Sequence, residues 1–64
     1  MGQRGEAMRY YSVIETMYKG QAIKERSEFF DNPMQSQAWL SNCLREAKAL
    51  KVRVLDHYLV KEAE

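Results

Sequence analysis

The fold of this chain is decided by residues 8–30, MRYYSVIETMYKGQAIKERSEFF. Two runs in this stretch, residues 8–18 and 21–29, favour β-strands, and Lys19-Gly20 is the only turn signal between them. The first run is rich in aromatic and β-branched residues, which fit the pleated surface of a sheet. The stretch therefore predicts a β-hairpin, closed either by a two-residue primed turn or by a three-residue loop.

The two strands of this hairpin differ in their side chains, and the difference predicts their places in the sheet. The first strand carries apolar groups on both faces, such as Ile14 on one and Val13 on the other, which is typical of a central strand. The second has the charged centre Lys24-Glu25-Arg26, which suits an exposed edge because charges there oppose unwanted strand pairing.

A helix is predicted to follow, from Pro33 to about Leu50. Asn32 is a favourable N-cap residue, and proline suits the first helical position. Apolar residues then recur at the spacing of one buried helical stripe, namely Leu40, Cys43, Leu44, Ala47 and Leu50. The stripe predicts that the helix packs on the sheet, with Cys43 as a buried structural residue.

The segment 52–60 favours a third strand, because it is again rich in β-branched and aromatic residues. Its apolar residues fall into two sets of opposite parity, Val54, Tyr58 and Val60 against Leu55 and Leu59. The alternative is one long C-terminal helix, since Leu50, Val54 and Tyr58 also keep helical spacing and no glycine interrupts the chain here.

Together these elements predict a small single-domain α+β fold with the order ββαβ. A right-handed crossover places the third strand beside the first, which gives a three-stranded antiparallel sheet of order 2-1-3 with the helix packed on one face. The alternative fold is ββα with one long C-terminal helix. Residues 1–7 are expected to form a flexible N-terminal tail, residues 8–61 the domain, and residues 62–64 a solvated C-terminal end.

Size and composition predict an associating protein. A chain of 64 residues buries only roughly 60% of the surface that its unfolded form exposes, so a partner is the expected source of further stability. The single cysteine excludes an intrachain disulfide and suits a reducing, cytoplasmic setting. We expect no metal and no cofactor, because one Cys and one His cannot supply the ligands of a structural zinc site. Homodimerisation is the leading expectation.

Enzymatic activity is not expected. Cys43 and His57 are the only nucleophile and base worth pairing, and the cysteine falls on the apolar stripe of the helix. Asp56 and His57 are neighbours on a strand, so they point to opposite faces and do not form an acid–base couple. No phosphate-binding glycine loop is present, and no small-molecule substrate is expected.

The predicted function is a non-enzymatic protein–protein interaction module. The sheet face away from the helix shows water a row of tyrosines and aliphatic groups, and such patches mark interaction sites. The expected interface residues are Tyr11, Val13, Met17 and Tyr58. The expected partners are a second copy and another protein, as for an accessory or inhibitor protein of a phage or mobile element.

The alternative is a small nucleic-acid-binding protein. Exposed sheet tyrosines can stack on unpaired bases while a local basic run follows the phosphates. The residues of that run are Arg45, Lys48, Lys51 and Arg53. The formal net charge of +1 counts against this reading and against a membrane surface as partner, since both usually need a clear basic excess.

Overall fold

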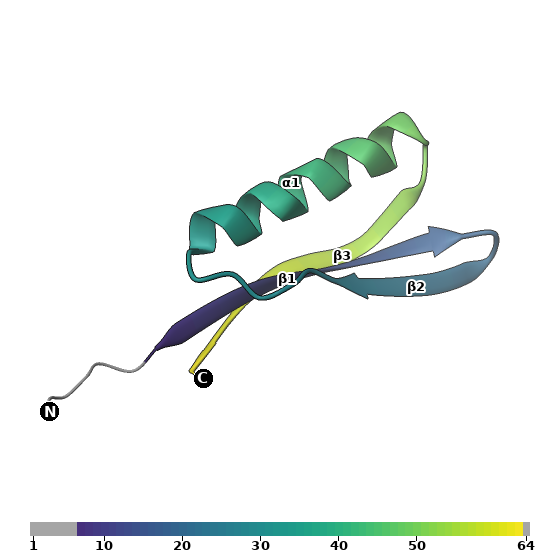
Figure 1. Ribbon diagram of the computed structural model, residues 1–64. Coiled ribbons are helices and arrows are strands. Elements are labelled where there is room, and N and C mark those ends of the chain that lie inside the picture. Colours follow the sequence, from purple (N-terminus) through teal and green to yellow (C-terminus); the bar gives the residue numbers. More distant parts are fainter. Residues whose placement is uncertain (1–6, 64) are drawn as a thin grey trace, which may run out of the picture.

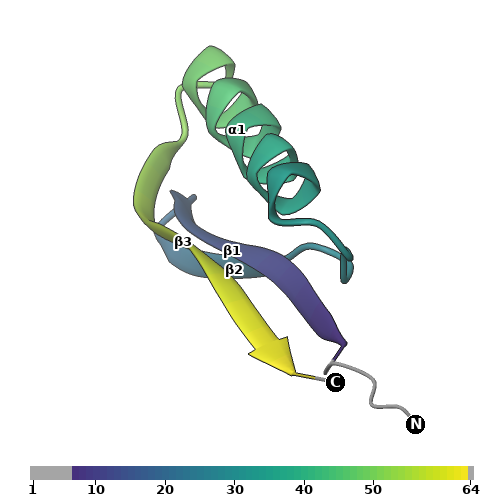
Figure 2. The ribbon, with the colours of Figure 1, turned by 90° about the vertical axis from the view of Figure 1, so that its left-hand side faces the viewer.

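A computed structural model describes residues 7–63, which form three strands and one helix. The elements are β1 (Met8–Tyr18), β2 (Gln21–Arg26), α1 (Pro33–Ala49) and β3 (Arg53–Ala63). The strands form one antiparallel sheet of order β2-β1-β3, and α1 lies across one face of it (Figure 1). Seen from the side, the helix and the sheet are two layers (Figure 2). The predicted ββαβ fold is confirmed, and the long C-terminal helix is excluded.

The hairpin closes with the shorter of the two predicted turns. Tyr18 pairs with Gln21, so that only Lys19 and Gly20 form the loop, and both have positive φ, 51° and 80°. This is the type I′ geometry, whose twist matches that of the two strands. The resulting register pairs Ile23 with Thr16 and thereby places Ile23 on the face of the sheet toward α1.

β3 contains a β-bulge that the sequence pattern does not reveal. Glu15 pairs with Asp56 and Thr16 with Val54, which leaves Leu55 as an extra residue without a partner on β1. The bulge reverses the alternation of side chains along β3. The prediction that Val54 and Tyr58 share a face is therefore wrong.

β3 is also longer than predicted, because its pairing with β1 continues to Ala63. Glu62 lies opposite Arg9, and Arg9 Nη2 lies 2.7 Å from Glu62 Oε1 in a half-buried ion pair. Residues 62 and 63 thus belong to β3, in which Glu62 is half-buried and Ala63 is exposed. The predicted tail, residues 1–7, lies outside the described residues except for Ala7, and Glu64 lies outside them too.

The helix begins and ends with well-formed caps. The side chain of Asn32 accepts a hydrogen bond from the Met34 amide at 2.6 Å, as the N-cap prediction requires. At the other end, Val52 N donates to Ala47 O and Lys51 N donates to Lys48 O, which is a Schellman motif. Its left-handed position, usually glycine, is Lys51 with φ 60°. A helix without a following glycine therefore still ends here.

The core is small and partly polar. Its buried apolar side chains are Val13, Ile14, Leu40 and Ala47, and three serines, Ser12, Ser27 and Ser36, are buried beside them. The Ser12 hydroxyl donates to the Ser36 carbonyl at 2.8 Å and lies 2.7 Å from the Ser36 hydroxyl. The Ser12 amide donates to the Ser27 hydroxyl. These short side chains join the start of α1 and the end of β2 to the middle of β1.

Candidate functional site

The four predicted interface residues lie on one face of the sheet. The alternation along β1 places Tyr11, Val13 and Met17 opposite the helix, and Tyr58 joins them because it pairs with Val13. Their exposure differs. Tyr58 is exposed, whereas Tyr11 and Met17 are half-buried and Val13 is only 6% exposed. Val13 supports this face from below, flanked by Arg26 and Tyr58, and does not itself offer contact surface.

Two arginines and two aromatic rings form a cluster on the same face. The guanidinium carbons of Arg9 and Arg26 lie 4.0 Å and 4.6 Å from the ring centroid of Phe29. The Phe29 ring meets Tyr11 edge to face, with centroids 5.4 Å apart. Cation–π and edge-to-face contacts of this kind hold long side chains in fixed positions. The cluster thus extends the predicted face by Arg9, Arg26 and Phe29, which sequence patterning did not identify.

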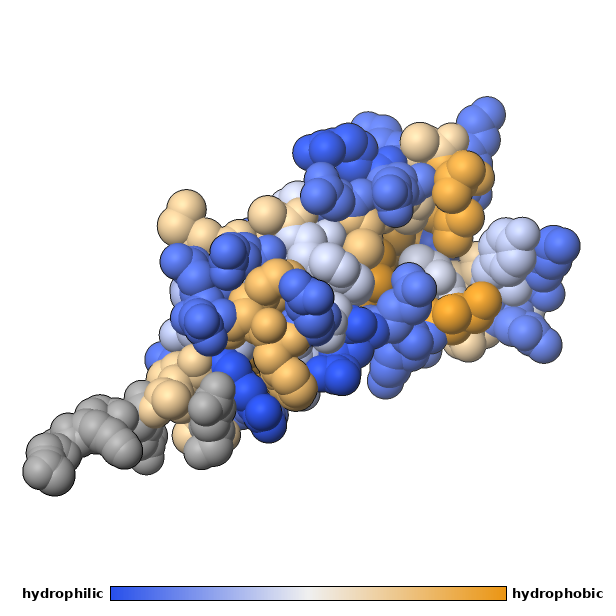
Figure 3. Space-filling model, in the orientation of Figure 1, coloured by the Kyte–Doolittle hydropathy of each residue, from blue (hydrophilic) through white to orange (hydrophobic). Residues whose placement is uncertain are grey.

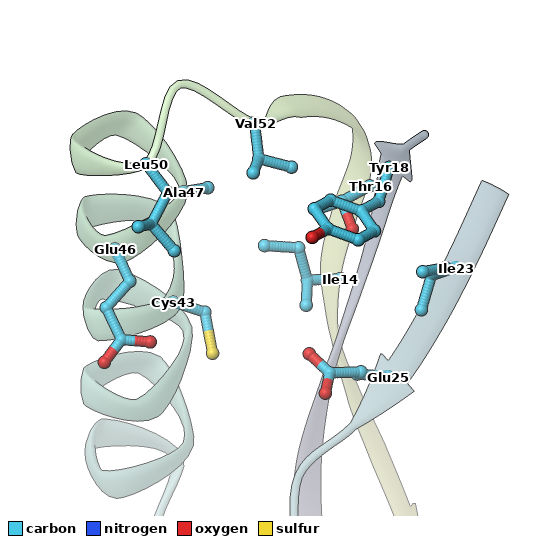
Figure 4. A pocket seen from close by; sticks show the side chains of 10 residues that line it. All are labelled: Ile14, Thr16, Tyr18, Ile23, Glu25, Cys43, Glu46, Ala47, Leu50 and Val52. Atoms are coloured by element: carbon cyan, nitrogen blue, oxygen red, sulfur yellow. The ribbon is translucent and has the colours of Figure 1, made fainter. Parts of the chain in front are cut away.

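A cleft of about 380 Å³ opens on the other face, between the second half of α1 and the hairpin. Ile14 and Ala47 lie deepest in it, and Tyr18, Ile23 and Leu50 border it with exposed side chains (Figure 4). In the space-filling view, apolar atoms gather between the end of α1 and the hairpin, with hydrophilic side chains around them (Figure 3). The cleft exists because α1 packs mainly on β1 and β3 and leaves β2 uncovered. All six residues of β2 are exposed.

A carboxylate and the cysteine face this cleft, and a second carboxylate, Glu46, lies on its helical rim. The Glu25 carboxylate and the Cys43 sulfur point toward one another across it, and Glu46 lies one helical turn from Cys43 (Figure 4). Burial, with smaller effects of Glu25 and Glu46, raises the pKa of the Cys43 thiol above its ordinary value. Cys43 is half-buried and not fully buried as predicted, because the helix stands away from β2. The raised pKa keeps it a neutral thiol, which opposes a nucleophilic role.

His57 is not placed to assist Cys43. Glu25, Ile14 and His57 form one row across β2, β1 and β3. Cys43 lines the cleft with Glu25 and Ile14, whereas His57 lies at the β3 end of this row, beyond Ile14. Asp56 accepts a hydrogen bond from the His57 backbone amide at 2.8 Å and does not contact the imidazole. Among residues 7–63, no group of three or more metal-binding side chains occurs.

The four predicted nucleic-acid contacts are all exposed, but they do not form one patch. Arg45 and Lys48 project from α1, and Lys51 follows in the turn after it. Arg53 pairs with Met17 and so points to the face away from the helix. Arg45 Nη1 donates a hydrogen bond to Asn42 Oδ1 at 3.1 Å. The structure therefore divides the basic run between two faces of the molecule.

Comparison of the chain with protein families, with curated proteins and with solved structures finds no match. In the part of the chain that the structure describes, no helix has the length and apolar character that crossing a membrane requires.

Proposed function

We propose that this protein is a small non-enzymatic protein–protein interaction module that forms a homodimer through the sheet face opposite α1. The observation that carries the proposal is the balance of apolar residues. Within the described residues, seven large apolar side chains are exposed while four apolar residues are buried. A core of that size contributes little stability, so burying exposed apolar surface against a partner is favourable.

The chemistry of this face supports association with protein. Tyr11, Phe29 and Tyr58 offer aromatic surface, and Arg26 lies over two of these rings. Tyrosine, phenylalanine and arginine are enriched in interface cores, and tyrosine and arginine are also enriched among the residues that dominate binding energy. A two-fold axis through this face stacks one sheet on the other. In this proposal the module acts in the cytoplasm as an accessory or inhibitor protein.

The test is the molecular mass in solution, measured by light scattering and sedimentation over a range of concentrations. Tyr58→Glu is expected to give a monomer, because it places a charge on an exposed part of the face. Met34→Glu is the matched control, since Met34 is an exposed apolar residue in the first turn of α1. A monomeric wild type at every concentration, or a dimer that survives Tyr58→Glu, would contradict the proposal.

Nucleic-acid binding is the second candidate, and the Arg9–Phe29–Arg26 stack favours it. Guanidinium planes and exposed rings together are suited to stacking on unpaired bases. The test is fluorescence anisotropy with single-stranded RNA and DNA at low and high salt. Binding that weakens steeply with salt and with the variant Arg9→Gln/Arg26→Gln would favour this function, whereas binding indifferent to both would exclude it.

A further inference from the structure

We infer that the cleft between α1 and β2 is a docking groove for one helix of another protein, an amphipathic helix that carries Lys or Arg beside its apolar stripe. The inference rests on the proposed function, because it names a partner for the interaction module. It uses the opposite face of the sheet, however, so the two can fail separately.

The widths of the elements indicate a vacant helix position. A helix is about 10 Å wide and strands lie about 4.8 Å apart, so one helix covers about two strands. α1 covers β1 and β3 and leaves the inner face of β2, with Ile23 and Glu25, without a helix above it. A second helix packed against α1 would lie about 8–10 Å from its axis, which is directly over β2.

The lining of the groove suits an apolar helical stripe. Three of the seven exposed large apolar side chains border it, Tyr18, Ile23 and Leu50, and Leu50 is 74% exposed. These three residues come from β1, β2 and the end of α1, so they form a trough and not a single ridge (Figure 4). Helices bind such troughs through apolar residues at positions i, i+3, i+4 and i+7. An added strand is a weaker fit, because the β2 edge carries Lys24, Glu25 and Arg26.

The charge of the groove selects the partner. Glu25 and Glu46 lie on its two sides, and neither has an ion pair within residues 7–63. A Lys or Arg on one flank of the apolar stripe of a partner helix can pair with Glu25, and a second on the other flank can pair with Glu46 on the helical rim of the groove. A second copy of this chain does not fit, because docking groove against groove would bring two carboxylates from each copy together in an interface. The groove is therefore separate from the proposed dimer face.

The experiment is a selection from a displayed library of helical peptides against the full-length protein. The apolar positions i, i+3, i+4 and i+7 are fixed, and the flanking positions vary among Lys, Arg, Gln, Ser and Glu. We expect the selected peptides to carry Lys or Arg at the flanks. In NMR titrations they should shift the signals of Ile14, Ile23 and Ala47 and leave those of Tyr11 and Tyr58 unchanged.

Variants of the groove complete the test. Glu25→Gln/Glu46→Gln should weaken the selected peptides about three- to tenfold, as expected for two partly exposed ion pairs. Glu15→Gln/Glu28→Gln removes the same charge elsewhere and should leave the affinity unchanged. Leu50→Ser should abolish detectable binding while circular dichroism shows an unchanged fold.

Four results would overturn the inference. The first two are a selection that yields no binding peptide and selected peptides that show no preference for Lys or Arg at the flanks. The other two are NMR shifts at the backbone amides of the β2 edge or on the opposite face of the sheet, and a homodimer in which the groove is already occupied. Peptide binding should persist in Tyr58→Glu, so a failed dimer and a failed groove give different results. If binding is lost with the dimer in that variant, the groove is not an independent site.

Discussion

The buried serines give the sharpest prediction, which is that Ser12→Ala destabilises the protein more than Ser36→Ala. Both residues are fully buried, and their hydroxyl oxygens lie 2.7 Å apart. Ser12 Oγ donates its one proton to the Ser36 carbonyl, so Ser36 Oγ must be the donor to Ser12 Oγ. Ser12→Ala therefore removes two hydrogen bonds and leaves a buried Ser36 hydroxyl without an acceptor.

The magnitudes follow from this arrangement. The lost hydrogen bond to the Ser36 carbonyl contributes about 1 kcal/mol and the orphaned Ser36 hydroxyl costs about 1–3 kcal/mol, so Ser12→Ala should cost about 2–4 kcal/mol. Ser36→Ala removes one bond and leaves Ser12 satisfied by the Ser36 carbonyl, so it should cost about 1 kcal/mol. In the double variant no hydroxyl is orphaned, and its cost should fall at least about 1 kcal/mol short of the sum of the two.

The assay is urea unfolding followed by circular dichroism, analysed as a double-mutant cycle. A domain of 64 residues has a total stability of about 3–10 kcal/mol, so these changes are large enough to measure. Ser41→Ala, on an exposed position of α1, is the control and should be neutral or slightly stabilising. Equal costs for the two single variants, or strictly additive costs in the double variant, would refute donation from Ser36 Oγ to Ser12 Oγ.

Three further predictions concern the turns and the cysteine. Lys51→Gly should raise the free energy of unfolding by about 0.5–1 kcal/mol, because it relieves a left-handed residue in the Schellman motif; an unchanged urea midpoint would contradict this. Gly20→Ala should lower it by about 1–2 kcal/mol through the backbone alone, since a Cβ there meets no atom within 4 Å; a neutral result would mean that the turn relaxes. Cys43 should react with iodoacetamide more slowly than a free thiol at pH 8, because burial raises its pKa. The variant Glu25→Gln/Glu46→Gln should react faster than the wild type, because the loss of the two carboxylates lowers that pKa. Equal rates in the variant and the wild type would exclude an effect of the carboxylates.

Much of the fold could be predicted because its local signals agree with the tertiary structure. The Lys19-Gly20 turn, the Asn32 cap and the charged β2 edge each depend on a few neighbouring residues, and each lies where predicted. The order of the strands followed from a right-handed crossover through the helix, together with the two apolar faces of β1, which are typical of a central strand. The end of α1 was harder to predict, because Lys51 takes the position at which a glycine would have marked it.

The remainder depended on contacts that no short stretch of sequence contains. The bulge at Leu55 is a property of the β1–β3 register and changes which side chains of β3 face the helix. The buried serines resemble surface residues in the sequence, and only the close approach of α1 to β1 hides them. The cleft depends on the sideways position of α1 over the sheet, which apolar periodicity does not determine.

The pairing of β1 with β3 also sets the folding kinetics. β1 has its more extensive contacts with β3, and Arg9 and Glu62 are 53 positions apart in the chain. The hairpin can form within microseconds, but it remains marginal until β3 arrives. Closing that long loop makes folding slow for so short a chain. During synthesis, β1 therefore stays without its main partner until the ribosome has translated the codons for β3.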